Sequence, residues 1–174
     1  DEAFMDAVPE EPEGLVGERV EGLVVLRSLT KHWSIPGVRA GYVTGDEAVI
    51  RELGRAQTPW SVSSPAITAI VACTSAEAAP EALERARTLD AWREFLESGL
   101  RDAGLAFVPS RAPFVLVRVG EGGHTRLRAQ GIAARRADTF PGLDSSWVRV
   151  AVRPPETTRA LLTALTGTST TGGE

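Results

Sequence analysis

The chain has 174 residues with a formal net charge of −4, and 43% of its residues are hydrophobic and 24% charged. These values are typical of a soluble globular protein with one or two small domains. The negative charge argues against a nucleic-acid or anionic-membrane partner, and the apolar runs are far shorter than the roughly 18 residues of a membrane span. One cysteine excludes an internal disulfide and, with only two histidines, argues against a metal site. We therefore expect a cytoplasmic protein without a bound metal.

The chain opens with DEAFMDAVP, a stretch typical of the loop that follows a buried strand. Neither a methionine nor an apolar signal segment comes before it. We therefore expect the sequence to be the C-terminal part of a longer protein, and any function inferred for it belongs to that longer protein.

The first half of the chain alternates strand and helix signals. Residues 20–26 (VEGLVVL) are short, apolar and β-branched, which predicts a buried strand of a largely parallel sheet. A second strand is expected over residues 40–43. Asp46 then fits the N-cap of a helix, and Pro65 fits the first turn of the next one. This order predicts an α/β architecture.

The second half begins with apolar residues at helical spacing over 79–103, and Gly104 is a suitable C-terminal stop. Strands and two further helices follow. The strands are predicted at 105–108, 114–119, 132–135 and 147–153, and the helices at 124–130, where Gly131 ends the helix, and at 155–165. This half therefore reads as a small α+β domain, followed by a disordered tail rich in glycine, serine and threonine.

Lys31 is the only lysine, because the other 18 basic residues are arginines. An amine can lose its proton and attack a carbonyl, whereas a guanidinium cannot, so Lys31 is a candidate for covalent binding of an aldehyde. The alternative is a gene biased against lysine codons that kept one surface lysine. Ser28, Thr30 and Arg39 favour the first interpretation, since hydroxyls and a guanidinium bind phosphate. With the Asp1 carboxylate for a protonated pyridine nitrogen, the implied ligand is pyridoxal phosphate.

Several ordered motifs carry a resemblance to a known family. DEAF at 1–4, SLTK at 28–31 and PGVRAGY at 36–42, with APFVLVRV and WVRVAVRPPETTRALL further on, resemble the fold-type I pyridoxal-phosphate enzymes of the aminotransferase class I/II superfamily. Within it, the chain is most similar to histidinol-phosphate aminotransferases and to the threonine-phosphate decarboxylases of cobalamin biosynthesis. The resemblance covers essentially the whole chain.

The resemblance implies a fold and its division along the chain. It implies the C-terminal half of a pyridoxal-phosphate transferase large domain, with a mostly parallel sheet and helices, followed by a small α+β C-terminal domain. The expected segments are part of the large domain at 1–76, a connecting long helix at 77–104, the small domain at 105–166 and a disordered tail at 167–174. The full-length protein is expected to be a homodimer.

The resemblance also implies roles for the residues around Lys31. Lys31 would bind the aldehyde covalently and later move the proton at the substrate Cα. Asp1 would keep the pyridine nitrogen protonated, and Ser28, Thr30 and Arg39 would bind the cofactor phosphate.

Two arginines in the second half match substrate-binding positions of the family. Arg149 matches the arginine that binds the substrate α-carboxylate. Arg136, thirteen residues earlier, matches a second arginine of members with phosphorylated substrates, and neighbouring Arg135 is the alternative. The implied substrate is a small phosphorylated amino acid.

One departure from the family guides the choice of reaction. Many aminotransferases have a tyrosine three residues after the pyridine-binding aspartate, and this chain has Phe4 there. The DEAF variant and a tryptophan in the loop PWSVSS resemble the cobalamin-pathway members, so the first expectation is threonine-phosphate decarboxylase. The alternatives are a histidinol-phosphate-type aminotransferase and, from another class, an incomplete, non-catalytic fragment.

Overall fold

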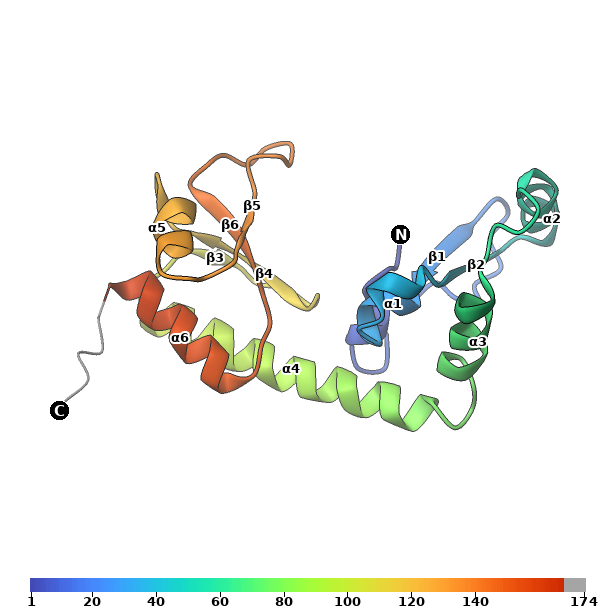
Figure 1. Ribbon diagram of the computed structural model, residues 1–174, viewed down its shortest axis with the longest axis horizontal. Helices are drawn as coiled ribbons and strands as arrows, with labels where there is room; N and C mark the ends of the chain where they lie inside the picture. Colours follow the sequence, from blue (N-terminus) through green and yellow to red (C-terminus); the bar gives the residue numbers. More distant parts are fainter. Residues whose placement is uncertain (168–174) are drawn as a thin grey trace. The chain divides into compact units, whose positions relative to one another are not determined.

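The computed structural model describes residues 1–167. The chain divides into two compact units, Asp1–Arg87 and Thr88–Glu174, and the division falls within helix α4, Ala79–Asp102 (Figure 1). Each unit is described by itself. Apart from Gly167, the tail expected at 167–174 lies outside the described residues. Among the described residues, no helix combines the length and the apolar character needed to cross a membrane.

The first unit combines two strands with short helices. Its elements are the 3-10 helix η1 (Met5–Ala7), strand β1 (Val24–Ser28), helix α1 (Leu29–His32), the 3-10 helix η2 (Pro36–Val38), strand β2 (Gly41–Gly45), and helices α2 (Glu47–Ala56) and α3 (Ser64–Cys73). The two helix starts predicted from the sequence are confirmed. The Asp46 side chain accepts hydrogen bonds from the amides of Ala48 and Val49, and Pro65 lies in the first turn of α3.

Strands β1 and β2 are antiparallel, with Val24 opposite Gly45 and Ser28 opposite Gly41. The sequence predicts a strand of a largely parallel sheet at 20–26. Among the described residues this strand pairs only with β2, and the pairing is antiparallel. The content of the connection is consistent with the antiparallel pairing, because a parallel pair is usually joined by a crossover that contains a full helix. Here only the one-turn helix α1 and the 3-10 helix η2 separate the strands.

The strand β1 also begins later than predicted. Gly22 adopts a positive φ of 74°, and the amide of Leu23 donates to the carbonyl of Val20, so residues 20–23 form a turn. Residues in a turn are not extended and do not pair with β2, so the strand begins at Val24 and ends at Ser28.

The second unit contains the rest of α4 and a small sheet. Its other elements are strands β3 (Phe107–Val108) and β4 (Phe114–Arg118), helix α5 (Gly123–Ala129), strands β5 (Arg135–Arg136) and β6 (Trp147–Ala151), and helix α6 (Pro155–Thr166). The strands run antiparallel in the order β3-β4-β6-β5. The predicted helices are confirmed. The strand predicted at 132–135 begins only at Arg135, because Ile132 donates its amide to the carbonyl of Leu127 and closes helix α5.

The core of the second unit lies on one face of this sheet. Alternate strand residues point to opposite faces, and the buried positions of β4 and β6 contact the apolar sides of the helices. The core residues are Leu96, Leu100, Val115, Val117, Leu127, Val148, Val150, Val152 and Leu161. Helix α6 lies against α4 so closely that a Cβ on Gly99 would meet Leu162 Cδ1 at 2.3 Å (Figure 1). The other face of the sheet therefore carries the remaining residues, Arg149 among them.

Candidate active site

The end of β1 brings two of the predicted phosphate-binding hydroxyls together. Ser28 is the last residue of β1 and the N-cap of α1, and its Oγ lies 2.9 Å from Oγ1 of Thr30. Thr30 is only 5% exposed. The buried Leu29 anchors this turn in a small apolar cluster with Ala40 and Ala66. The two hydroxyls are therefore held as a pair at the end of the strand.

Lys31 follows directly in α1, and its side chain is exposed. Its Nζ lies 6.0 Å from the centroid of the Phe4 ring, so the lysine and the first segment of the chain are neighbours. Asp1 lies three residues before Phe4 at the exposed chain start, where its carboxylate accepts a hydrogen bond from the amide of Ala3 at 3.0 Å. The structure thus brings the amine of Lys31 close to Phe4, the position where many aminotransferases have a tyrosine.

Arg39 adopts a left-handed backbone conformation with φ 59° and ψ 50°, which is uncommon for a residue with a side chain. Its guanidinium is exposed and donates to the carbonyl of Pro36 at 3.0 Å. Within residues 1–167, no hydrogen bond joins Arg39 to Ser28 or Thr30. A backbone conformation of this kind costs free energy, and such residues are found more often at functional sites than elsewhere.

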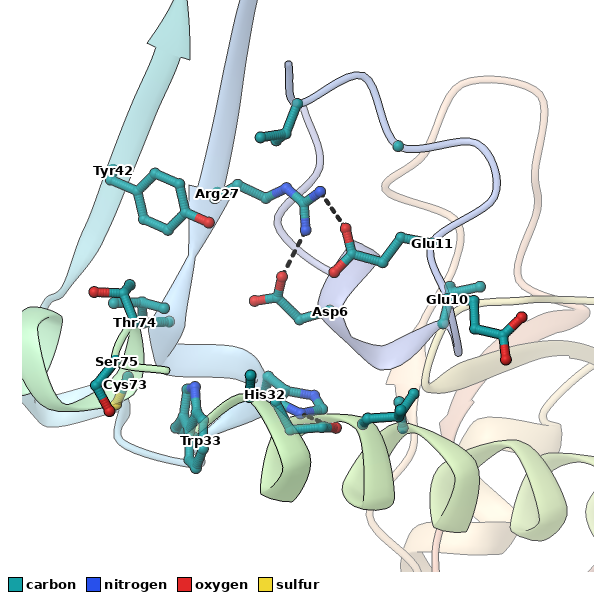
Figure 2. A pocket seen from close by; sticks show the side chains of 18 residues that line it. Asp6, Glu10, Glu11, Arg27, His32, Trp33, Tyr42, Cys73, Thr74 and Ser75 are labelled. Atoms are coloured by element: carbon teal, nitrogen blue, oxygen red, sulfur yellow. Dashed lines mark hydrogen bonds and ion pairs between the residues drawn. The ribbon is translucent and has the colours of Figure 1, made fainter. Parts of the chain in front are cut away.

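A buried ionic cluster is centred on Arg27, whose side chain is 3% exposed. Arg27 precedes Ser28 in β1, so the two side chains point to opposite faces of the strand. Its Nη1 lies 2.6 Å from Asp6 Oδ1, and its Nη2 donates to Glu11 and lies 3.0 Å from Glu2 Oε2. Figure 2 shows the guanidinium reaching from β1 toward Asp6 and Glu11, with Tyr42 beside it on β2. We call Arg27, Glu2, Asp6 and Glu11 the Arg27 cluster.

The sequence reasoning missed this cluster. An arginine within the apolar run VVLRS and six acidic residues in the first 13 positions were its only signals. Burial raises the pKa of Asp6, and the charge of Arg27 only partly offsets that effect. Burial alone would lower the pKa of Arg27, but hydrogen bonding and charge from Glu11 and the charge of Asp6 raise it. The carboxylates and the guanidinium therefore compensate one another's burial.

A cavity of about 600 Å³ lies beside the Arg27 cluster within the first unit (Figure 2). Its lining is Asp6, Val8, Glu10, Glu11, Gly14, Val16, Arg27, Leu29, His32, Trp33, Tyr42, Cys73, Thr74, Ser75, Ala79, Ala82, Leu83 and Ala86. Ser28, Thr30 and Lys31 are not part of this lining, whereas Leu29 and His32 of the same turn are. His32 is fixed at its wall by a contact of 3.0 Å between its Nε2 and the carbonyl of Ala82.

In the second unit, Arg149 lies on the face of the sheet opposite the core. It is directly opposite Arg135 on β5 and Leu116 on β4. Its guanidinium lies over the Phe114 ring, 4.5 Å from the centroid. Burial lowers the pKa of Arg149, and the like charge of Arg135 lowers it further. Two arginines on one face, with no carboxylate paired to either in the part of the chain described, are suited to an anionic ligand.

Arg136, which the resemblance implies as the second substrate-binding arginine, is placed differently. It lies opposite Val148, a core residue, and its Nε donates to Asp138 Oδ1 at 3.1 Å. The hydrogen bond with Asp138 raises the pKa of Arg136 and lowers that of Asp138. The register therefore favours Arg135 over Arg136 as the companion of Arg149.

The family model described as aminotransferase class I and II matches residues 1–165. The chain belongs to this family. It is 42% identical over 156 residues to a histidinol-phosphate aminotransferase of Mycobacterium tuberculosis, covering 88% of the chain and 43% of that protein. It is 35% identical over 183 residues to the threonine-phosphate decarboxylase of Salmonella typhimurium, covering 95% and 46%.

A solved structure supports the same fold for this family member. The histidinol-phosphate aminotransferase of Clostridium acetobutylicum matches with a TM-score of 0.83 and 28% identity, over 96% of the chain and 52% of that structure. The α/β class and the transferase fold expected from the sequence are thus confirmed. The chain spans about half the length of the curated relatives it matches.

Proposed function

We propose that this family member is part of a pyridoxal-phosphate-dependent enzyme that acts on a small phosphorylated amino acid. The observation that carries the proposal is the single lysine placed directly after the paired hydroxyls of Ser28 and Thr30, within a chain of the aminotransferase class I and II family. Pyridoxal phosphate supplies an aldehyde that binds an amine and a ring that withdraws electrons from the substrate Cα.

The residues at the end of β1 fit this cofactor by their chemistry. Lys31 is the candidate for the covalent bond, since its exposed amine is accessible to an aldehyde. The hydroxyls of Ser28 and Thr30 can donate to phosphate oxygens, and the exposed Arg39 guanidinium can add a charge-assisted contact. The carboxylate of Asp1 can pair with a protonated pyridine nitrogen. In the catalytic cycle, the amine of Lys31 would move the proton at the substrate Cα.

We assign the substrate's two anionic groups to the open face of the second unit's sheet. Arg149 is the candidate for the carboxylate, and Arg135, its cross-strand neighbour, for the phosphate. Arginine suits both groups because its planar fork can donate two parallel hydrogen bonds. Arg136, the first choice from the sequence, is already engaged by Asp138.

Two reactions are candidates. Threonine phosphate carries both a carboxylate and a phosphate, whereas histidinol phosphate carries only the phosphate, so in a transaminase Arg149 would bind a carboxylate of glutamate or 2-oxoglutarate. We place decarboxylation of threonine phosphate first, because Phe4 lies beside Lys31 where many aminotransferases have a tyrosine, and a phenyl ring cannot donate a hydrogen bond. Transamination of histidinol phosphate is the second candidate, favoured by the identity of 42% against 35% for the decarboxylase. Decarboxylation of threonine phosphate would give aminopropanol phosphate, for cobalamin biosynthesis.

Product analysis on the intact protein separates the two reactions. The enzyme is incubated with threonine phosphate, and carbon dioxide and the amine product are measured with and without 2-oxoglutarate. Carbon dioxide release that does not require 2-oxoglutarate supports decarboxylation. Glutamate formation from histidinol phosphate and 2-oxoglutarate, without carbon dioxide release, refutes it. The Lys31→Ala variant is the control and should show neither activity.

A rival from another class is a non-catalytic fragment. The chain of 174 residues is titrated with pyridoxal phosphate, and we expect weak retention of the cofactor and no turnover, since the chain spans about half of its relatives. Stoichiometric, tight binding with an absorbance typical of a lysine adduct contradicts that expectation. The homodimeric state and the cytoplasmic location stay predictions, and light scattering on the intact protein tests the former.

A further inference from the structure

The Arg27 cluster connects the segments that carry the proposed cofactor residues. Arg27 and Ser28 are consecutive in β1, so the guanidinium faces the cluster while the next residue begins the Ser28 to Lys31 turn. Glu2 directly follows Asp1. An ion pair between Glu2 and Arg27 therefore joins two chain segments at positions immediately next to proposed cofactor contacts.

Glu2 is fixed at both its backbone and its side chain. Its amide donates to the carbonyl of Leu26 at 2.9 Å, which lays the chain start beside β1. Its Oε1 accepts the amide of Leu15 at 2.7 Å, and its Oε2 lies 3.0 Å from Arg27 Nη2. Glu2 is 8% exposed. Three contacts, one from the backbone and two from the side chain, therefore hold Glu2 beside β1.

Strand β2 also packs against Arg27, since the two strands pair along their whole length. Tyr42 lies opposite Arg27, and Gly41 lies opposite Ser28. A Cβ on Gly41 would be 2.7 Å from the carbonyl oxygen of Arg27, so the two backbones approach more closely than any larger residue permits. Arg39 lies two residues before Gly41. The position of Arg27 thus influences the chain start, the lysine turn and the segment of Arg39.

We infer that Arg27 is a positioning residue, whose buried guanidinium holds Asp1 and the Ser28 to Lys31 turn in register through Glu2, Asp6 and Glu11. The inference rests on the proposed cofactor role of Lys31. A charge buried this deeply is retained only where carboxylates pair with it, and here they come from 16 to 25 positions earlier in the chain. The contact therefore acts across segments that local structure does not fix.

The test measures covalent capture at Lys31 instead of turnover. The intact protein is incubated with pyridoxal phosphate, the adduct is reduced with borohydride, and modification of Lys31 is located and quantified by peptide mass spectrometry. We compare Arg27→Met and Arg27→Lys with the control Arg51→Met, an exposed arginine paired to Glu47. All rates are measured at low temperature, where circular dichroism shows that each variant is folded.

We expect Arg27→Met to slow capture by roughly tenfold or more, since a displacement of about 1 Å can cost up to a hundredfold. Arg27→Lys should recover part of the rate, because it restores the charge but not the fork. Hydrogen exchange gives a readout without cofactor. The amides of Glu2 and Leu15, which depend on this arrangement, should exchange faster in Arg27→Met and remain protected in Arg51→Met.

If Arg27→Met does not fold, Glu2→Gln takes its place, because it keeps the size of the side chain and removes its charge. Capture at the wild-type rate in Arg27→Met, or in both Arg27→Lys and Glu2→Gln, overturns the positioning role alone. Absence of capture at Lys31 in the intact wild-type protein overturns the proposed cofactor site, and the positioning role with it. The two failures are therefore distinguishable.

Discussion

Arg135 and Arg149 lie directly opposite each other on neighbouring antiparallel strands, with both side chains on the face of the sheet away from the core. In most sheets two like charges at such a position are destabilising. Burial and the charge of Arg135 lower the pKa of Arg149, which shows the cost of the arrangement. An anion between the two guanidinium groups would remove that cost, which is the physical reason for assigning the substrate to this face.

The first prediction separates the two neighbouring arginines. Arg135→Ala should lower kcat/KM for the phosphorylated substrate by roughly 10- to 150-fold, the value of a hydrogen bond to a charged group. Arg136→Ala should leave kcat/KM nearly unchanged, because its guanidinium is exposed and paired with Asp138. Steady-state kinetics of the intact protein measures both. Equal losses in the two variants, or a larger loss in Arg136→Ala, would return the role to Arg136.

A second prediction concerns the stability of the first unit. Arg27→Met leaves three carboxylates without their buried cation and should lower the free energy of unfolding of this unit by about 3–5 kcal/mol. Arg51→Met, which removes an exposed ion pair, should change it by less than about 1 kcal/mol. Urea denaturation followed by circular dichroism measures the difference. A loss in Arg27→Met no larger than in Arg51→Met would show that the buried cluster contributes little.

Local chemistry in the sequence predicted where the helices begin and end. Asp46 caps α2, Pro65 lies in the first turn of α3, and Gly104 follows α4 with a positive φ of 67°. These features depend on residues within one turn of the helix terminus, so a single sequence is sufficient to identify them. The lysine turn was recognised for the same reason, since its residues lie within four positions of one another.

Features that depend on distant residues were not predictable in this way. The carboxylates around Arg27 come from a different segment, and nothing in their spacing signals the contact. The antiparallel pairing of β1 and β2 goes with a connection that holds no full helix, and that is clear only once the strand ends and the short helices between them are known. The choice between Arg135 and Arg136 depends on the register of β5 against β6, and a shift of one residue reverses which side chain meets Arg149.

The third prediction uses the raised pKa of Asp6. Burial raises this pKa above 3.8, so the folded state binds the proton of Asp6 more tightly than the unfolded state does. The resulting contribution to stability is complete below pH 3.8 and is lost as the pH rises through the pKa of the folded state. Asp6→Asn lacks the effect. The stability of the variant relative to wild type should therefore increase between about pH 3 and 6, as measured by urea denaturation at each pH.

Asp144 supplies a control of opposite sign. Hydrogen bonds from the hydroxyl and amide of Ser146 lower its pKa below 3.8, so its contribution is present above that value and lost as the pH falls. Asp144→Asn should therefore lose stability relative to wild type as the pH rises over the same range. A parallel pH response of the two variants would contradict the assignment for Asp6.

The last prediction tests the close approach of β2 to Arg27 with a matched pair of glycines. A Cβ on Gly41 would lie 2.7 Å from the carbonyl oxygen of Arg27, and backbone atoms cannot move aside as a flexible side chain can. Gly41→Ala should therefore lower the free energy of unfolding by roughly 1–3 kcal/mol. Gly54 lies within α2 with no atom near its missing Cβ, so Gly54→Ala should raise the free energy by about 0.5–1 kcal/mol through helix propensity. Denaturant midpoints that shift in the same direction for both variants would show that β2 does not constrain the strand that carries Arg27 and Ser28.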